Sequence, residues 1–71
     1  METKDLTLAA FLRVKGYTLS HVEKVGKHGI FHYDDVPPAL ISNYDRGVCE
    51  VEPQLFHNAI KALTTLVNRA T

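Results

Sequence analysis

The segment that decides the fold is PQLFHNAIKALTTLVNR, residues 53–69. Its apolar residues recur at the three- and four-residue spacing of one helical face, and they are Leu55, Phe56, Ala59, Ile60, Ala62, Leu63, Leu66 and Val67. Polar residues fill the opposite side, and Pro53 suits a first helical turn because its missing N–H has no partner there anyway. The spacing therefore predicts a helix over Pro53–Arg69. A stripe this wide needs a partner surface, which the preceding residues must supply.

The composition describes one small folded domain over residues 1–71. The hydrophobic fraction of 45% is enough for a core, although a chain of 71 residues buries only about 60% of its unfolded surface. Eight basic residues balance eight acidic ones. This neutrality removes the simplest argument for nucleic acid or an anionic membrane as a partner.

The sequence also predicts where the protein works. No run approaches the roughly 18 apolar residues of a membrane-spanning helix. The start METKDLTLAAF lacks the basic region and the apolar run of a secretory signal. Cys49 is the only cysteine, so no intramolecular disulfide can form. We expect a cytoplasmic protein with no membrane association.

The first half of the chain predicts a helix followed by a hairpin. Thr3 or Asp5 can cap a helix that runs to about Lys15, and Gly16 suits the left-handed residue that follows a helix. Two strands, Tyr17–Val25 and Ile30–Asp34, then surround the glycine-containing loop of residues 26–29.

The hairpin register follows from the loop length. If the loop has an even number of residues, the residue numbers of opposed positions sum to 55. Val22 then faces Tyr33, and Glu23 faces His32. One face then carries Val22, Phe31 and Tyr33, and the other carries His21, Glu23, His32 and Asp34. A bulge or an odd loop would change this register.

The remaining elements complete an α+β pattern. Asp35-Val36-Pro37-Pro38 ends the second strand and opens a short helix that Gly47 ends, and Val48–Val51 is a short strand. The predicted order is helix, strand, strand, helix, strand, helix. We expect a small three-stranded, largely antiparallel sheet with the N- and C-terminal helices packed on one face. The sequence leaves the strand order open, and an exposed edge could accept a partner strand.

The polar face of the hairpin holds the sharpest chemical constellation. His21, Glu23, His32 and Asp34 combine two imidazoles with two carboxylates, a donor set that suits zinc or another divalent metal. The competing interpretation is a pair of cross-strand charge interactions on a solvated face.

Catalysis has no comparable signature. Cys49 lies beside Glu50, which would raise the pKa of a thiol, and neither Ser20 nor Ser42 sits in a nucleophile elbow. The loop at residues 26–29 lacks the phosphate-loop pattern and does not precede a helix. We predict a protein that is not an enzyme and needs no cofactor.

Two binding hypotheses remain, and the first is a protein partner. Tyr44 and Arg46 near a helix end, with Leu66 and Val67 on the last helix, are candidate contact residues for another protein or for a second copy in a homodimer. The alternative for Tyr44 is a ring packed in the core. The second hypothesis is weak nucleic-acid binding through Lys24, Lys27, His28 and Arg46, which is not favoured because the RNA-recognition consensus is absent.

Several short motifs resemble a small bacterial and phage domain family of unknown function. They are Thr3-Lys4-Asp5-Leu6, Ala9-Ala10-Phe11-Leu12, Lys15-Gly16-Tyr17, Val22-Glu23, Phe31 with Tyr33, Asp34-Asp35 and Val51-Glu52-Pro53. The resemblance covers nearly the whole chain. It implies a compact α+β module and carries over no catalytic residue and no ligand.

Overall fold

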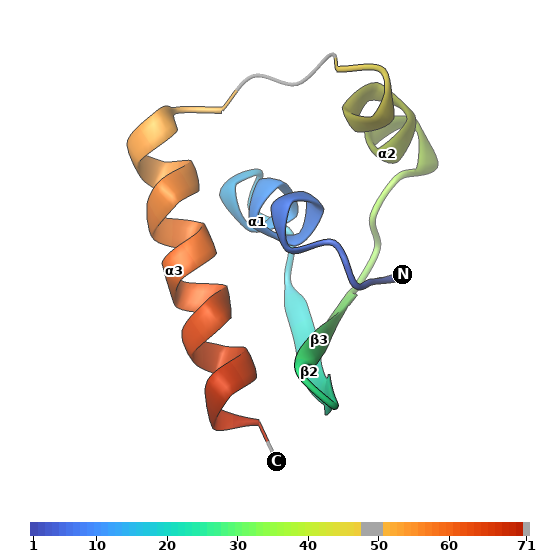
Figure 1. Cartoon of the computed structure of the whole chain (residues 1–71). Coiled ribbons are helices and arrows are strands. Elements are labelled where there is room, and N and C mark those ends of the chain that lie inside the picture. Colours follow the sequence, from blue (N-terminus) through green and yellow to red (C-terminus); the bar gives the residue numbers. More distant parts are fainter. Residues whose placement is uncertain (48–50, 71) are drawn as a thin grey trace.

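The structure is a computed structural model that describes residues 1–47 and 51–70. Its elements are β1 (Glu2–Thr3), α1 (Leu6–Val14), β2 (Leu19–Val25), β3 (His28–Tyr33), α2 (Pro38–Asp45) and α3 (Pro53–Arg69). The strands form one antiparallel sheet in the order β1-β3-β2. Figure 1 shows the hairpin of β2 and β3 beside α1 and α3. The predicted α+β class with a small antiparallel sheet is therefore confirmed. None of the described helices has the length and hydropathy needed to cross a bilayer.

Helix α1 begins and ends as its sequence predicts. The Oδ1 atom of Asp5 accepts hydrogen bonds from the backbone N–H groups of Thr7 and Leu8, at 2.9 and 3.3 Å, so Asp5 is the N-cap. Thr3, the other predicted cap, belongs to β1. At the far end Gly16 has a φ of 93°, and the N–H of Tyr17 donates to the carbonyl of Leu12 at 3.1 Å. This is a helix C-cap with a left-handed glycine, and its hydrogen bonds satisfy carbonyl groups at the end of the helix.

The hairpin turns more tightly than the sequence analysis predicts. Val25 pairs with His28 and Val22 pairs with Phe31, so the residue numbers of opposed positions sum to 53 from His21 to Val25, and the turn has two central residues. The first of them, Gly26, has a φ of 63°, a conformation that glycine adopts at little cost. The predicted register was therefore wrong by two residues. A shift of two preserves the side of the sheet on which each residue lies, so the predicted division into two faces holds from His21 to His32. An irregularity between Leu19 and His21 changes the alternation there and places Leu19 opposite Tyr33.

The extra strand residues include Gly29, which was expected in the loop. Gly29 is buried on β3, and a Cβ built on it would overlap a methyl group of Val67 on α3. On the same face of β3, the hydroxyl of Tyr33 donates to the carbonyl of Ala9 on α1 at 2.7 Å. Helices α1 and α3 therefore cover one face of the sheet, as predicted.

The third strand of the described sheet is β1. Glu2 pairs with His32 along β3, which makes β3 the central strand. The sequence analysis did not predict β1, because two residues are too short to show an alternating pattern. Residues 48–50 of the predicted strand Val48–Val51 lie outside the described residues, and Val51 is not part of a strand.

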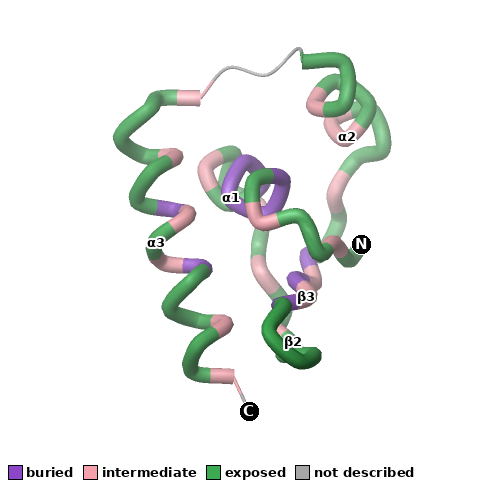
Figure 2. The backbone as a smooth tube through the Cα atoms, in the orientation of Figure 1, coloured by how far each residue is buried: buried purple, intermediate pink, exposed green. Residues whose placement is uncertain are grey.

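The core lies between α1, α3 and the sheet. Its buried apolar residues are Leu8, Ala9, Ala10, Phe11, Leu12, Phe31, Tyr33, Ala59 and Leu63. Figure 2 shows this burial concentrated on α1, β3 and the middle of α3, whereas α2 has no buried residue. The ring of Tyr44 on α2 lies 5.3 Å from the ring of Phe11, measured between centroids. This contact confirms the interpretation of Tyr44 as a residue that packs against the core.

Candidate metal centre on the hairpin

Three of the four residues predicted as metal ligands meet on the open face of the hairpin. His21 and Glu23 lie two residues apart on β2, and His32 lies opposite His21 on β3. Because side chains alternate along a strand, these residues point away from the face that α1 and α3 cover. One nitrogen of each histidine and one carboxylate oxygen all lie within 4.8 Å of one another.

Glu23 lies at the centre of this group. Its Oε1 atom is 2.7 Å from Nε2 of His32 and 3.4 Å from Nε2 of His21. The two imidazole rings stack, with centroids 4.0 Å apart and planes 11° from parallel. The three residues therefore place three donor atoms of two chemical kinds close together, with the two rings lying face to face.

The Nε2 atom of His32 is close to Glu23 without making a well-directed hydrogen bond to it. The atom is buried and has no hydrogen-bond partner among the described residues, although the carboxylate oxygen is only 2.7 Å away. The short distance and the missing hydrogen bond are compatible, because a hydrogen bond also requires the ring N–H to point at its acceptor. A bound ligand in line with this nitrogen would give the atom a directed partner, which the carboxylate does not.

The other nitrogen of each imidazole has a partner outside the group. Nδ1 of His32 lies 3.6 Å from a carboxylate oxygen of Glu2, and Nδ1 of His21 lies 3.4 Å from the hydroxyl oxygen of Ser20. In metal sites, a ligating histidine almost always bonds through its second nitrogen to a carboxylate, a carbonyl or water, which orients the ring. Glu2 and Ser20 are placed to do this here, leaving both Nε2 atoms for the metal.

The side chains must rearrange to hold a metal ion, because the donor atoms lie at unequal separations of up to 4.8 Å. Donor atoms about 2.0–2.1 Å from a tetrahedral zinc ion lie roughly 3.3 Å apart. The 3.4 Å separation of His21 and Glu23 already fits, whereas the 2.7 Å separation of His32 and Glu23 must lengthen. Stacked rings must also turn, because a metal lies in the plane of each imidazole that binds it. The His21 side chain is 56% exposed, so it has room to turn.

Asp34, the fourth predicted ligand, is not part of the group. It follows the end of β3 and is exposed, and its backbone N–H donates to the carbonyl of Thr18 at 3.2 Å. The sequence analysis placed Asp34 opposite His21 because it predicted a hairpin loop two residues longer than the observed turn. It missed Glu2, whose position beside His32 follows only from the pairing of β1 with β3.

The predicted partner-binding residues do not form one surface. Tyr44 packs on Phe11 and Arg46 is exposed just beyond α2, whereas Val67 packs on Gly29 near the other end of the molecule. Figure 1 shows α2 and the last turns of α3 at opposite ends. Leu66 is the most exposed apolar member of the set, at 37%.

The predicted nucleic-acid residues divide in the same way. Lys24, Lys27 and His28 are exposed around the turn of the hairpin, and Arg46 follows α2 at the distant end. The structure therefore brings together three of these four basic residues.

No family model, curated protein or solved structure matches the chain. The resemblance to the family of unknown function stays a prediction.

Proposed function

We propose that this domain binds a divalent transition-metal ion, with zinc as the best-fitting choice, through His21, Glu23 and His32. The observation that carries the proposal is the grouping of three ligand atoms within 4.8 Å, with Glu2 near Nδ1 of His32 at 3.6 Å and Ser20 near Nδ1 of His21 at 3.4 Å. Imidazole and carboxylate donors suit zinc in sites with three protein ligands. Such a site keeps a coordination position open, which water or a partner's side chain can fill.

The competing explanation is a set of cross-strand charge pairs that hold no metal. Exposed pairs of this kind contribute little to stability, about 0–1 kcal/mol each. Charge pairs alone would also leave Nε2 of His32 buried and without an aligned partner among the described residues. A metal ion bound to that nitrogen would supply the partner that it lacks, which is why we favour the metal-binding function.

Zinc titration followed by calorimetry and NMR tests the proposal. We expect one zinc ion per chain, with the largest changes at the imidazole resonances of His21 and His32. Replacing His32 with Gln removes one donor and should weaken binding at least tenfold. Zinc at a hundredfold excess over its Kd should also stabilise the fold by about 2.7 kcal/mol, since it binds only the folded site.

Two exposed histidines elsewhere provide matched controls. His28→Gln at the hairpin turn and His57→Gln on α3 remove an imidazole without touching the group. Both variants should bind zinc as the parent chain does. Equal loss of affinity in His57→Gln and His32→Gln, or no zinc binding at all, would show that the hairpin face carries charge pairs alone.

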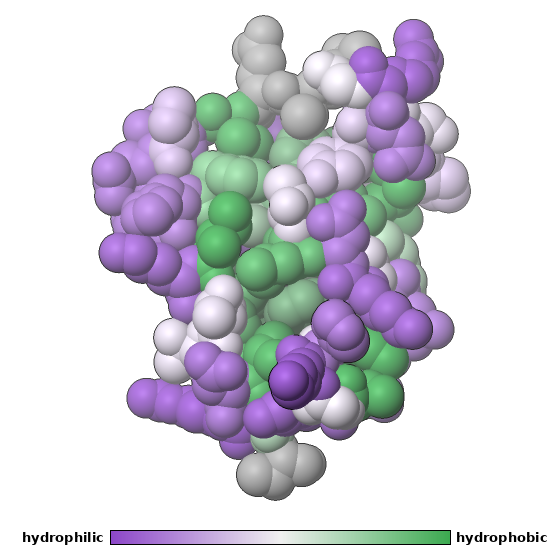
Figure 3. Space-filling view, in the orientation of Figure 1, coloured by the Kyte–Doolittle hydropathy of each residue, from purple (hydrophilic) through white to green (hydrophobic). Residues whose placement is uncertain are grey.

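A second candidate function is self-association through the exposed side of α3. Leu55, Ala62 and Leu66 follow one another at spacings of seven and four residues, so they lie on one strip of the helix. Leu55 is 56% exposed and Leu66 is 37% exposed, whereas Leu63 is fully buried. Figure 3 shows hydrophobic residues gathered beside α3, in the middle of the visible face. This exposed strip supports a homodimer as a proposal.

Light scattering over a wide concentration range tests self-association. If the strip forms the interface, Leu66→Glu should reduce the molar mass from dimer to monomer without unfolding the chain. Lys61→Glu is the control, because Lys61 is exposed on the polar side of the same helix. A monomer at every concentration would exclude the homodimer.

A further inference from the structure

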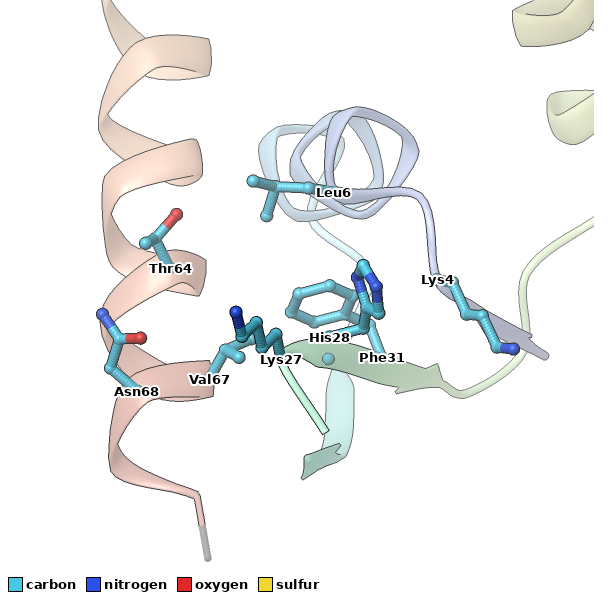
Figure 4. Close-up of a pocket in the computed structure, with 9 residues that line it drawn as sticks. Lys4, Leu6, Lys27, His28, Phe31, Thr64, Val67 and Asn68 are labelled. Atoms are coloured by element: carbon cyan, nitrogen blue, oxygen red, sulfur yellow. The ribbon is translucent and has the colours of Figure 1, made fainter. Parts of the chain in front are cut away.

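A pocket of about 220 Å³ lies where the turn of the hairpin meets the first turn of α1 and the last turns of α3. Its apolar wall includes Leu6, Phe31 and Val67, which come from three different elements. Lys27 and His28 border it at the turn (Figure 4). The pocket therefore combines an apolar interior with a polar entrance, as small-molecule sites commonly do.

All the ionisable residues that line the pocket are basic. The ionisable residues that line it are Lys4, Lys27 and His28, and no acidic residue from the described parts of the chain lines it. None of these three takes part in an ion pair identified within residues 1–47 and 51–70. A chain of zero net charge thus lines this pocket with basic residues, and with no acidic residue among the described ones.

The close-up separates the groups that face the pocket from those that do not. Lys27 reaches back from the turn toward the space between Leu6 and Thr64, and the ring of His28 stands beside Phe31 (Figure 4). The ammonium end of Lys4 points away. The hydroxyl of Thr64 already donates to the carbonyl of Ile60 at 2.8 Å, so it offers no free donor.

Gly29 creates this arrangement. Without a side chain there, α3 approaches β3 so closely that an added Cβ would overlap Val67. The close approach brings Val67 and Asn68 next to Lys27 and His28, which are separated from them by about forty residues of sequence. The pocket is therefore a product of the tertiary packing.

We propose that this pocket binds a small organic carboxylate whose apolar part is compact. Lys27 supplies a positive charge, His28 supplies a hydrogen-bond donor, and Leu6 and Val67 contact the apolar part. The small volume excludes a large ligand. A single-stranded nucleic acid would need basic groups along an extended track, whereas here they surround one hollow. This inference is independent of the metal site on the opposite face of the sheet.

Benzoate is the probe, and benzyl alcohol is its neutral counterpart of similar shape. In an NMR titration of the ¹⁵N-labelled chain, benzoate should shift the amide signals of Gly29, Phe31 and Asn68 in a saturable way. Benzyl alcohol should bind at least fivefold more weakly, because it lacks the charge. Equal binding of both compounds would overturn the proposal without the use of any variant.

Three variants locate the binding site. Lys27→Gln and His28→Gln should each weaken benzoate binding at least fivefold, whereas Lys24→Gln should leave it unchanged. Lys24 is the matched control, since it lies on the same hairpin and does not line the pocket. All three residues are exposed, so the variants should fold normally, which circular dichroism checks. An equal effect of all three, or salt-sensitive binding of an oligothymidylate in place of benzoate, would show a general basic surface and overturn the pocket proposal.

Discussion

The two faces of the hairpin differ in what they contribute. On β3, Phe31 and Tyr33 are only 2% and 1% exposed and belong to the core. His32, between them in sequence, points to the opposite face and joins Glu23 and His21. One face therefore holds the fold together, and the other carries polar groups on which the core does not depend. Residues freed from packing in this way are available for chemistry.

The largest expected effect comes from breaking the core face. Phe31→Ala should reduce the free energy of unfolding by about 3–5 kcal/mol, because it removes a buried aromatic ring and leaves a cavity. A chain of this size has a total stability of roughly 4–10 kcal/mol, so much of it would be lost. Urea unfolding followed by circular dichroism measures the change. A loss under about 1 kcal/mol would contradict the assignment of Phe31 to the core.

A smaller effect is expected where the core face meets α3. Gly29→Ala should destabilise the fold by about 1–3 kcal/mol, because the new methyl group overlaps the stiff, β-branched Val67. In the background of Val67→Ala, the same glycine substitution should cost much less. A double-mutant cycle measured by urea unfolding shows this coupling. Additive effects would mean that the two residues do not touch.

Tyr33→Phe tests a single hydrogen bond on the core face. The Tyr33 hydroxyl donates to Ala9, so its removal should cost about 0.5–1.5 kcal/mol near neutral pH. Burial also raises the pKa of Tyr33 above its ordinary value of 10.0, although Arg13 acts in the opposite direction. The neutral phenol is therefore the form that the fold favours.

The raised pKa of Tyr33 predicts a pH dependence with a definite sign. The unfolded chain releases the phenolic proton near pH 10.0, before the folded chain does. Stability from this group is complete below that pH and is lost as the pH rises through the higher folded pKa. Tyr33→Phe should lack this alkaline loss, which chemical unfolding at pH 8 to 11 can measure. A parallel pH dependence in both chains would contradict the prediction.

The polar face should respond least in stability and most in metal affinity. Glu2→Gln removes the carboxylate beside Nδ1 of His32, an exposed pair worth about 0–1 kcal/mol. If the proposed site is correct, zinc affinity should nevertheless fall about 10- to 100-fold, because a carboxylate beside the second nitrogen orients a ligating imidazole. Calorimetry on both chains tests this. Unchanged zinc affinity would exclude Glu2 from the site.

The helices were predictable because their ends carry local signals. Asp5, Gly16, Pro53 and Gly47 each act on backbone groups within a few residues, so their effects can be read in sequence order. The two faces of the hairpin were predictable for a similar reason, since alternation along a strand survives a register error of two residues. Of the four residues predicted as metal ligands, the structure brings His21, Glu23 and His32 together, and Asp34 lies outside this group.

By itself, the sequence determined the amphipathic helix Pro53–Arg69, the hairpin and the identity of its two faces, because each depends on spacing within a short segment. Only the tertiary structure decided the register, the place of Glu2 and the pocket at Lys27 and His28. These depend on how closely α3 can approach β3 at Gly29 and on how β1 joins the sheet. Contacts between residues distant in the chain are set by packing in three dimensions, and no local pattern encodes them.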